Sequence, residues 1–131
     1  MEEAARRWAV TWARGWREHD VDAIAGLYAE DATFRSAPER DVKRGRGGVR
    51  DYSEWAFADE ASAECWFADP LVSGSRAAAS WWTISTARDG ASVTLIGVSR
   101  LRFDTEGLVV DQQDVWTQLE GPHEPYAGWA E

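Results

Sequence analysis

The residue of this chain with the clearest potential for acid–base chemistry is Asp114, in the run Gln113-Asp114-Val115-Trp116. Side chains alternate across a strand, so Gln112, Asp114 and Trp116 share one face of the strand predicted there. If that face points inward, apolar rings surround Asp114, and burial raises a carboxyl pKa because it disfavours the charged form. Such a group can exchange protons near neutral pH. The pattern therefore indicates proton-transfer chemistry at Asp114.

The orientation of Asp114 depends on the hairpin that precedes its strand. The preceding strand, Ser92–Phe103, carries two arginines on one face, so its other face is expected to point inward. A four-residue loop, Asp104–Gly107, pairs Phe103 with Leu108 and turns Asp114 inward as well. A three-residue loop with a bulge would turn it outward. We expect the four-residue loop and an inward Asp114.

Hydrogen-bonding side chains and tryptophan rings are expected to complete a pocket around Asp114. The chain has nine tryptophans, which indicates a core with a cavity lined by rings. Alternatively, Asp114 accepts hydrogen bonds from Tyr28, Tyr52 or a tryptophan N–H and only stabilises the core. The expected ligand-binding residues are Trp12, Tyr52, Trp81, Ser99, Gln112 and Trp116.

The other residues that commonly carry chemistry form no recognisable site. His19 and His123 have no second histidine or cysteine at ligand spacing, so we expect no metal, and we expect His19 at the surface. Cys65 is the single cysteine, which excludes an intrachain disulfide and a CxxC site. The segment Arg44–Gly48 lacks the lysine of a phosphate-binding loop and reads as a turn into a helix. We expect no metal and no redox cofactor.

Length, composition and charge favour one acidic, soluble domain. The chain has 131 residues, of which 44% are hydrophobic, enough for one core but too few for two. Its net charge of -9 repels nucleic-acid phosphates and anionic lipid, so we expect neither as a partner. The first residues, Met1–Arg6, are acidic where a signal peptide is basic and apolar, and no apolar run reaches the roughly 18 residues that cross a membrane. We therefore expect a cytoplasmic protein.

Helical periodicity dominates the first half of the chain and strand periodicity the second half. Trp8, Trp12 and Trp16 form a stripe that is typical of a core-facing helix, and Asp20 is a candidate N-cap for the next helix. The predicted helices are Glu3–Glu18, Val21–Ala29 and Val49–Asp59. The predicted strands are Ala32–Arg35, Glu64–Val72, Arg76–Ala87, Ser92–Phe103 and Leu108–Leu119. This order predicts an α+β fold with a mainly antiparallel sheet.

Five local segments follow one another in this order of elements: Trp12–Asp20, Leu27–Phe34, Arg44–Val49, Leu101–Leu108 and Glu120–Trp129. Together with the element order, they resemble the nuclear transport factor 2-like superfamily in its bacterial SnoaL-like branch. The resemblance covers essentially the whole chain as one domain, residues 1–131. It implies a cone, in which three N-terminal helices pack in a strongly curved sheet that leaves a pocket at the open end. The superfamily includes ketosteroid isomerase, scytalone dehydratase, limonene epoxide hydrolase and polyketide cyclases, so the fold alone does not decide the function.

The catalytic residues of ketosteroid isomerase are not found at the corresponding positions. Where that enzyme has its oxyanion-binding tyrosine, this chain has Trp12. Where it has the base aspartate and the second oxyanion donor, this chain has Ser36 and Ser99. The resemblance therefore argues against steroid isomerisation by that mechanism.

The relay of limonene epoxide hydrolase is kept at one position. Its last-strand aspartate corresponds to Asp114. Its arginine and second aspartate correspond to Trp81 and Thr83, which cannot replace them. The resemblance thus supports Asp114 as a candidate but not that relay.

The leading hypothesis is a SnoaL-like enzyme that needs no cofactor and performs proton-transfer chemistry, such as cyclisation, isomerisation, dehydration or hydrolysis, on a small apolar or partly polar molecule. Asp114 would be the catalytic residue. The alternative is a ligand-binding or dimerisation module without chemistry, because a lone carboxylate lacks the usual orienting partner. An adaptor that binds another protein through its open sheet face is a third hypothesis. The superfamily commonly pairs through its sheets, so a homodimer is expected in each case.

Overall fold

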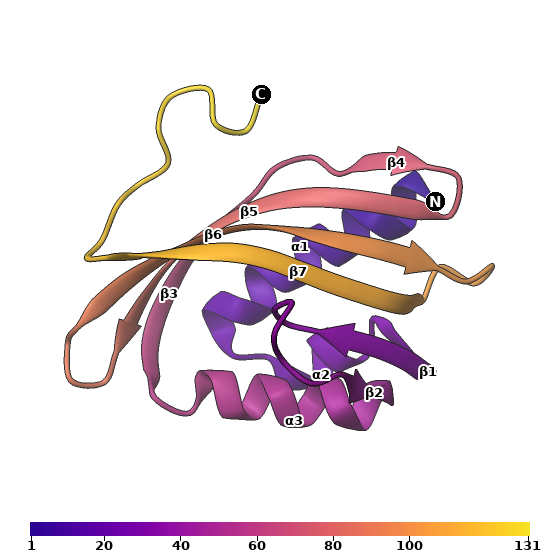
Figure 1. The fold of residues 1–131 in the computed structure, drawn as a ribbon, viewed down its shortest axis with the longest axis horizontal. Helices are drawn as coiled ribbons and strands as arrows, with labels where there is room; N and C mark the ends of the chain where they lie inside the picture. The colour runs from indigo at the N-terminus through magenta and orange to yellow at the C-terminus, as the bar shows by residue number, and fades with distance from the viewer.

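A strongly curved sheet wraps around the N-terminal helices in the computed structural model, which describes all residues, 1–131 (Figure 1). The sheet has seven strands in the order β2-β1-β7-β6-β5-β3, with β4 paired to β5. All neighbours are antiparallel except β1 and β7. The strands are β1 (Tyr28–Arg35), β2 (Lys43–Arg44), β3 (Glu60–Phe67), β4 (Leu71–Ser73), β5 (Arg76–Ala87), β6 (Ser92–Phe103) and β7 (Val109–Glu120). The expected α+β architecture is confirmed.

The helices lie on the concave side of the sheet (Figure 1). Helix α1 (Glu2–Glu18) buries its tryptophan stripe there, with Trp8 and Trp12 almost fully buried. Helix α2 (Val21–Ala25) is shorter than predicted, although the predicted cap is present: the Asp20 side chain accepts a hydrogen bond from Ala23 N at 3.1 Å. The chain leaves α2 early because it joins β1 at Tyr28, where the backbone pairs with β7. Helix α3 (Gly45–Phe57) closes the open side of the curved sheet.

The predicted strand Glu64–Val72 is wrong in its start and in its continuity, since it begins at Glu60 and is two strands. Strand β3 ends at Phe67 and β4 begins at Leu71, and both pair with β5. Pro70 lies in the break and has no N–H to donate to a ladder. The segment Arg44–Gly48 is not the turn predicted from the sequence, because Arg44 belongs to the short strand β2 and α3 already begins at Gly45.

The hairpin between β6 and β7 differs from the expected one but leaves Asp114 on the expected face. Phe103 pairs with Val109 rather than Leu108, and a bulge follows, so Arg102 pairs with Asp111. The longer loop and the bulge each move the pairing by one residue. Two such shifts cancel in the alternation of faces, and Asp114 lies opposite Ser99 on the inward side.

Gly97 allows β5, β6 and β7 to approach closely at the tryptophan-rich part of the sheet. A Cβ at this position would lie 2.6 Å from Trp116 Cβ, 2.6 Å from Trp81 Cζ2 and 2.7 Å from the backbone oxygen of Val115. These atoms belong to neighbouring strands and to a large ring, so the ring or the strands must move to admit a methyl group. The two indole rings can pack over β6 because Gly97 has no side chain.

Replacing Gly97 by alanine should therefore lower the free energy of unfolding by about 1–3 kcal/mol, the usual cost of overpacking a core. Urea denaturation followed by tryptophan fluorescence measures this. Gly47→Ala is the matched control, because its Cβ would meet nothing within 4 Å and alanine favours the helix in which it lies. Equal stability of the two variants would contradict the expected steric role of Gly97.

Candidate functional site

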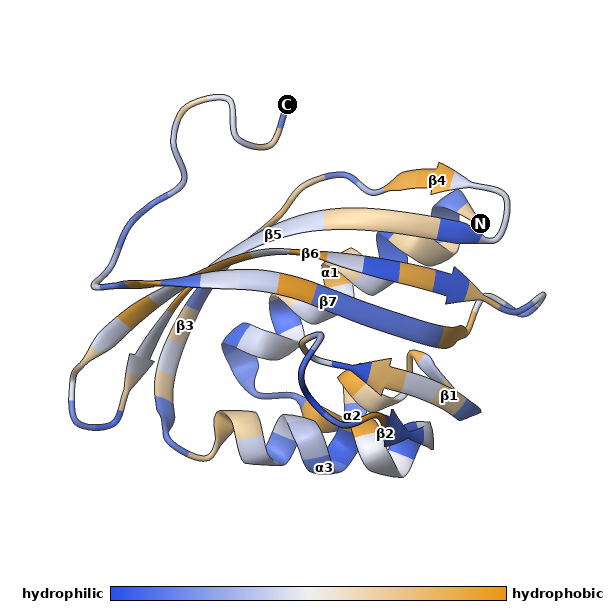
Figure 2. Ribbon diagram, in the orientation of Figure 1, coloured by the Kyte–Doolittle hydropathy of each residue, from blue (hydrophilic) through white to orange (hydrophobic).

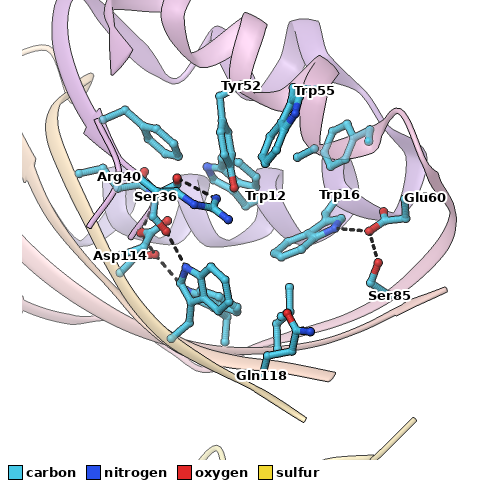
Figure 3. A pocket seen from close by; sticks show the side chains of 18 of the residues that line it. Trp12, Trp16, Ser36, Arg40, Tyr52, Trp55, Glu60, Ser85, Asp114 and Gln118 are labelled. Atoms are coloured by element: carbon cyan, nitrogen blue, oxygen red, sulfur yellow. Dashed lines mark hydrogen bonds between the residues drawn. The ribbon is translucent and has the colours of Figure 1, made fainter. Parts of the chain in front are cut away.

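A cavity of about 320 Å³ lies between the concave face of the sheet and helices α1 and α3 (Figure 3). This volume is at the lower end of the range of roughly 300–1,000 Å³ found for small-molecule sites. Its walls are mainly aromatic, with a few polar groups at defined places. The tryptophans that line it are Trp8, Trp12 and Trp16 from α1, Trp55 from α3, Trp81 from β5 and Trp116 from β7.

Asp114 lies on the wall of this cavity. Its Oδ1 accepts hydrogen bonds from Ser99 Oγ at 2.6 Å and from Gln112 Nε2 at 3.0 Å, whereas no protein group donates to Oδ2. The side chain keeps some accessible surface because it borders the cavity, but protein atoms crowd it on its other sides. This burial raises the pKa of Asp114 to about 7, against the lowering effect of the two donors. Both protonation states are therefore available near neutral pH.

The hydroxyl of Ser99 is oriented by a second hydrogen bond. Trp81 Nε1 donates to Ser99 Oγ at 3.0 Å, so the hydroxyl proton is free to point at Asp114. Because an indole N–H can only donate, Ser99 Oγ must be the acceptor in its hydrogen bond with Trp81, and its own proton is left for Asp114. Trp81 thus shapes the cavity and orients one of the two groups that hold the carboxyl group.

The amide of Gln112 is oriented by a larger network that reaches α1 and β1. Its Oε1 accepts hydrogen bonds from Trp8 Nε1 at 3.1 Å and from the Tyr28 hydroxyl, which in turn accepts one from Trp12 Nε1 at 2.9 Å. Burial raises the pKa of Tyr28, so this phenol stays a neutral donor. With Oε1 held by two donors, Nε2 of Gln112 must face Asp114. Sequence reasoning missed this network, because its members lie up to 104 positions apart.

All six residues expected to bind the ligand line the same cavity as Asp114: Trp12, Tyr52, Trp81, Ser99, Gln112 and Trp116. Two of them, Ser99 and Gln112, direct their hydrogen bonds at Asp114. The alternative in which Tyr28, Tyr52 or a tryptophan N–H donates to Asp114 is wrong, because the donors are Ser99 and Gln112. The phenol of Tyr52 points from α3 into the cavity (Figure 3), and burial raises its pKa.

The polar character of β7 is visible in Figure 2 as a hydrophilic stretch in the first half of the strand, where the sequence has Asp111-Gln112-Gln113-Asp114. Alternation places Gln112 and Asp114 inward, and Gln112 is 2% exposed. Burying two polar side chains in adjacent inward positions costs free energy unless they are hydrogen-bonded. Their partners in α1, β1 and β6 meet that requirement and hold the carboxyl group in one place.

A second carboxylate, Glu60 of β3, lies at the opposite end of the cavity from Asp114 (Figure 3). Its oxygens are fully engaged, with His19 Nε2 at 2.8 Å, Ser85 Oγ at 2.5 Å and Trp16 Nε1 at 3.3 Å. The sequence predicts His19 at the surface, and this prediction is wrong. Its ring stacks on Phe57 and is hydrogen-bonded to Glu60. Since these contacts join α1, α3, β3 and β5, Glu60 stabilises the framework of the cavity.

Arg40, in the segment between β1 and β2, is a further lining residue that sequence reasoning did not single out. Its guanidinium lies between two indole rings, with Cζ 5.4 Å from the ring centre of Trp55 and 5.3 Å from that of Trp116. It donates one hydrogen bond, to Ser36 Oγ at 3.1 Å. The residue brings a positive charge to the end of the cavity that contains Asp114 (Figure 3).

No group of three or more histidine, cysteine, aspartate or glutamate side chains is arranged to hold a metal ion. None of the helices has the length and apolar character that crossing a membrane requires.

Comparisons with known proteins agree with this architecture. A family model described as a SnoaL-like domain matches residues 9–112. A comparison with curated proteins finds no relative of matching sequence. Three solved structures are similar over nearly the whole chain at low identity, which shows a shared NTF2-like fold.

The first, RV0760c from Mycobacterium tuberculosis, has a TM-score of 0.78 at 16% identity and covers 90% of this chain and 96% of its own. The second is SalBIII, described as an epoxide hydrolase/cyclase-like enzyme with a role in pyran ring formation in the polyether salinomycin. It has a TM-score of 0.74 at 22% identity and covers 89% and 95%. The third, an NTF2-like protein of unknown function from Exiguobacterium sp. 255-15, has a TM-score of 0.73 at 17% identity and covers 87% and 98%.

Proposed function

Since the chain belongs to the SnoaL-like domain family, we propose that it is an enzyme that moves a proton within a small molecule held in the tryptophan-lined cavity, with Asp114 as the acid/base. The observation that carries the proposal is the state of the Asp114 carboxyl group. One oxygen is held by two oriented donors, the other has no protein donor, and the pKa is raised to about 7 by burial. A general base or acid works best when its pKa is close to the working pH.

The surrounding residues support a proton transfer through Oδ2. As a base, Asp114 takes a proton on Oδ2, while Ser99 and Gln112 continue to donate to Oδ1 in both protonation states. They are positioning residues in this proposal. When a ligand fills the cavity, the ligand and the indole rings together displace water from the reacting atoms, and Tyr52 lines the same cavity as a hydrogen-bond donor to the ligand. Isomerisation, cyclisation, dehydration and hydrolysis all contain such a step.

The likeness to SalBIII supports a reaction of this general class but, at 22% identity, does not choose among these reactions. No metal or redox cofactor is required for the proposed step, since the proton returns from Asp114 to the product or to water.

The second candidate function is ligand binding without chemistry. The full engagement of Glu60 favours it, because both oxygens of this carboxylate are already hydrogen-bonded to other side chains and neither is left to act as a second acid/base group. Proton exchange separates the two functions, since a binding module would hold a ligand without accelerating the exchange of its protons.

The test is deuterium incorporation at carbon. Planar ketones and β-dicarbonyl compounds that quench the tryptophan fluorescence of the protein are incubated with it in D₂O, and exchange is followed by proton NMR. We expect the protein to accelerate exchange of the protons next to the carbonyl group for at least one bound compound. Ligands that bind but exchange at the rate of buffer would support the binding module instead.

We also propose that the protein forms a homodimer and acts in the cytoplasm. The outer face of β6 and β7 exposes Val98, Val115 and Leu119, which are suited to burial against a second copy. The buried free thiol of Cys65 suits a reducing compartment. Sedimentation equilibrium should give twice the mass of the chain, and a monomer at micromolar concentration would contradict the first of these proposals.

A further inference from the structure

Arg40 is the one cationic side chain that lines the cavity, and it forms no ion pair with a carboxylate. The cavity-lining residues include no other arginine and no lysine, and none of the ion pairs in the structure involves Arg40. Three carboxylates, Glu39, Asp41 and Asp51, border the adjacent surface depression together with Arg40, yet none pairs with it. A guanidinium has five N–H groups; Ser36 Oγ accepts from one of them at 3.1 Å, and the Tyr52 phenol is a second neighbour of the group. Most of its hydrogen-bonding capacity is therefore left for a ligand.

The position of the Arg40 side chain is set in advance. Arg35 Nη1 donates to the backbone oxygen of Arg40 at 2.6 Å, and Trp116 Nε1 donates to the backbone oxygen of Ser36 at 2.6 Å, so both ends of the segment are tied to the sheet. The rings of Trp55 and Trp116 flank the guanidinium. A flat cation between two aromatic faces keeps its N–H groups in its own plane, away from the rings. Preorganised donors of this kind stabilise charge that develops during a reaction.

We propose that the cavity takes a planar carbonyl compound and that Arg40 binds the oxygen on which negative charge develops. This inference rests on the proposed function, because it names the substrate class of the same site. Asp114 Oδ2 takes a proton from the carbon next to the carbonyl group. The electron pair of that C–H bond forms a carbon–carbon double bond, and the carbonyl π pair moves to oxygen, which gives an enolate. The proton on Asp114 then returns to carbon or oxygen of the product.

The charges in the cavity balance during this step. Before it, the negative charge lies on Asp114, and after it, on the substrate oxygen beside Arg40. Arg40, Ser36 and Asp114 lie at one end of the cavity, and Tyr52 of α3 points toward the same end, so a ring system lying between the indoles can present its carbonyl group to both arginine and aspartate (Figure 3). Glu60 at the other end is already satisfied and does not compete for the cation.

Two probes of equal shape and different charge test the role of Arg40. 2-Naphthoate stands in for the enolate, and 2-naphthamide for the neutral carbonyl compound. Their affinities are measured by tryptophan quenching at pH 6, where naphthoate is ionised and Asp114 is largely protonated because its pKa is about 7. We expect the wild-type protein to bind the anion at least tenfold more tightly than the amide, which corresponds to about 1.4 kcal/mol.

Three variants identify the source of that preference. Arg40→Gln should reduce it to about one while leaving the affinity for the amide within about threefold, and Arg40→Lys should restore part of it because the charge returns without the planar fork. Arg102→Gln is the matched control, since Arg102 is exposed on the outer face of β6, and it should keep the preference of the wild type.

The outcomes distinguish this inference from the proposed function. Equal binding of both probes by the wild-type protein, or an unchanged preference in Arg40→Gln, would overturn the role of Arg40. Exchange that depends on Asp114 would leave the proposed function standing in that case. If neither probe binds and the protein accelerates the exchange of no ketone, both the role of Arg40 and the proposed function are overturned.

Discussion

The Asp114→Asn variant is expected to lose deuterium exchange activity by about 10²- to 10⁴-fold, the usual contribution of a positioned acid/base group. Asparagine keeps the size of the side chain, and its oxygen can still accept hydrogen bonds from Ser99 and Gln112. It cannot, however, take a proton at the position of Oδ2. The affinity for 2-naphthamide should change little, because the rings that enclose the ligand remain in place. Parallel measurements of exchange by NMR and of binding by fluorescence separate the two effects.

Asp111→Asn is the matched control for this experiment. Asp111 lies on the same strand and the opposite face, where it accepts a hydrogen bond from Thr33 Oγ1 at 2.5 Å that asparagine can preserve. It should keep the exchange rate of the wild-type protein. If Asp114→Asn exchanges protons as fast as Asp111→Asn, Asp114 takes no part in proton transfer.

The wild-type rate should also depend on pH in a way that the variant does not reproduce. If the Asp114 carboxylate is the base, exchange increases as the group ionises and levels off above an apparent pKa near 7. A rate that is flat between pH 5 and 8 would contradict this role.

The second large effect concerns stability: the Asp114→Asn substitution that lowers activity is expected to raise the free energy of unfolding. The carboxyl group has a pKa of about 7 in the folded protein and about 3.9 in an unfolded chain. The folded state therefore holds the proton to a higher pH than the unfolded state. Consequently, the contribution of this group to stability is greatest below pH 4, falls as the pH rises from about 4 to 7, and is constant above that range.

Asp114→Asn should consequently be more stable than the wild-type protein at pH 8, by an amount that grows between pH 5 and about pH 7 and changes little above that. The full difference in pKa corresponds to about 4 kcal/mol, at 1.36 kcal/mol per pKa unit. The effect is expected to be smaller, about 1–3 kcal/mol, because water can enter the cavity and solvate the carboxylate. Urea denaturation of both proteins at pH 5, 6, 7 and 8 measures it, and the comparison cancels the titration of all other groups. A variant that is less stable than the wild type at pH 8 would show that Asp114 is better solvated in the folded protein than its burial indicates.

An increase in stability together with a loss of activity would be informative beyond the single residue. A carboxylate kept in a low-dielectric site opposes folding, and proteins keep such groups where function needs them. Neither a purely structural aspartate nor a surface aspartate would give this combination.

Part of the fold could be read from the sequence because it depends on local alternation. Strands β5 and β6 begin and end at the predicted residues, and the inward face of β6 includes Ser99, which is 1% exposed. Their turns carry glycine and polar residues, and the two faces of β6 differ clearly in polarity, with Arg100 and Arg102 on one of them. The division of the segment after α3 into β3 and β4 was not predicted, since both pieces pair with the same partner strand and only Pro70 marks the break.

For the candidate site, the sequence by itself determined that Asp114, Gln112 and Trp116 share one face of a strand, because that follows from period-two geometry. Which face points inward was decided by a hairpin whose loop and bulge together shift the register by two residues, and no local rule predicts both. The environment of the carboxyl group was decided only by the tertiary structure. Its donors are held by Trp8, Tyr28 and Trp81, which come from a helix and two other strands.

Arg40 is the clearest case of what local patterns cannot show. In the sequence it is one of several charged residues in a loop, with no neighbour at a meaningful spacing. In the folded chain it lies between a tryptophan of α3 and one of β7, at the end of the cavity that contains Asp114. The sequence determines the alternation that places Asp114, Gln112 and Trp116 on one face. The burial of Asp114 and the direction of its hydrogen bonds depend on residues that are distant in the sequence. The raised pKa of Asp114 and the position of Arg40 at the same end of the cavity are therefore properties of the tertiary structure alone.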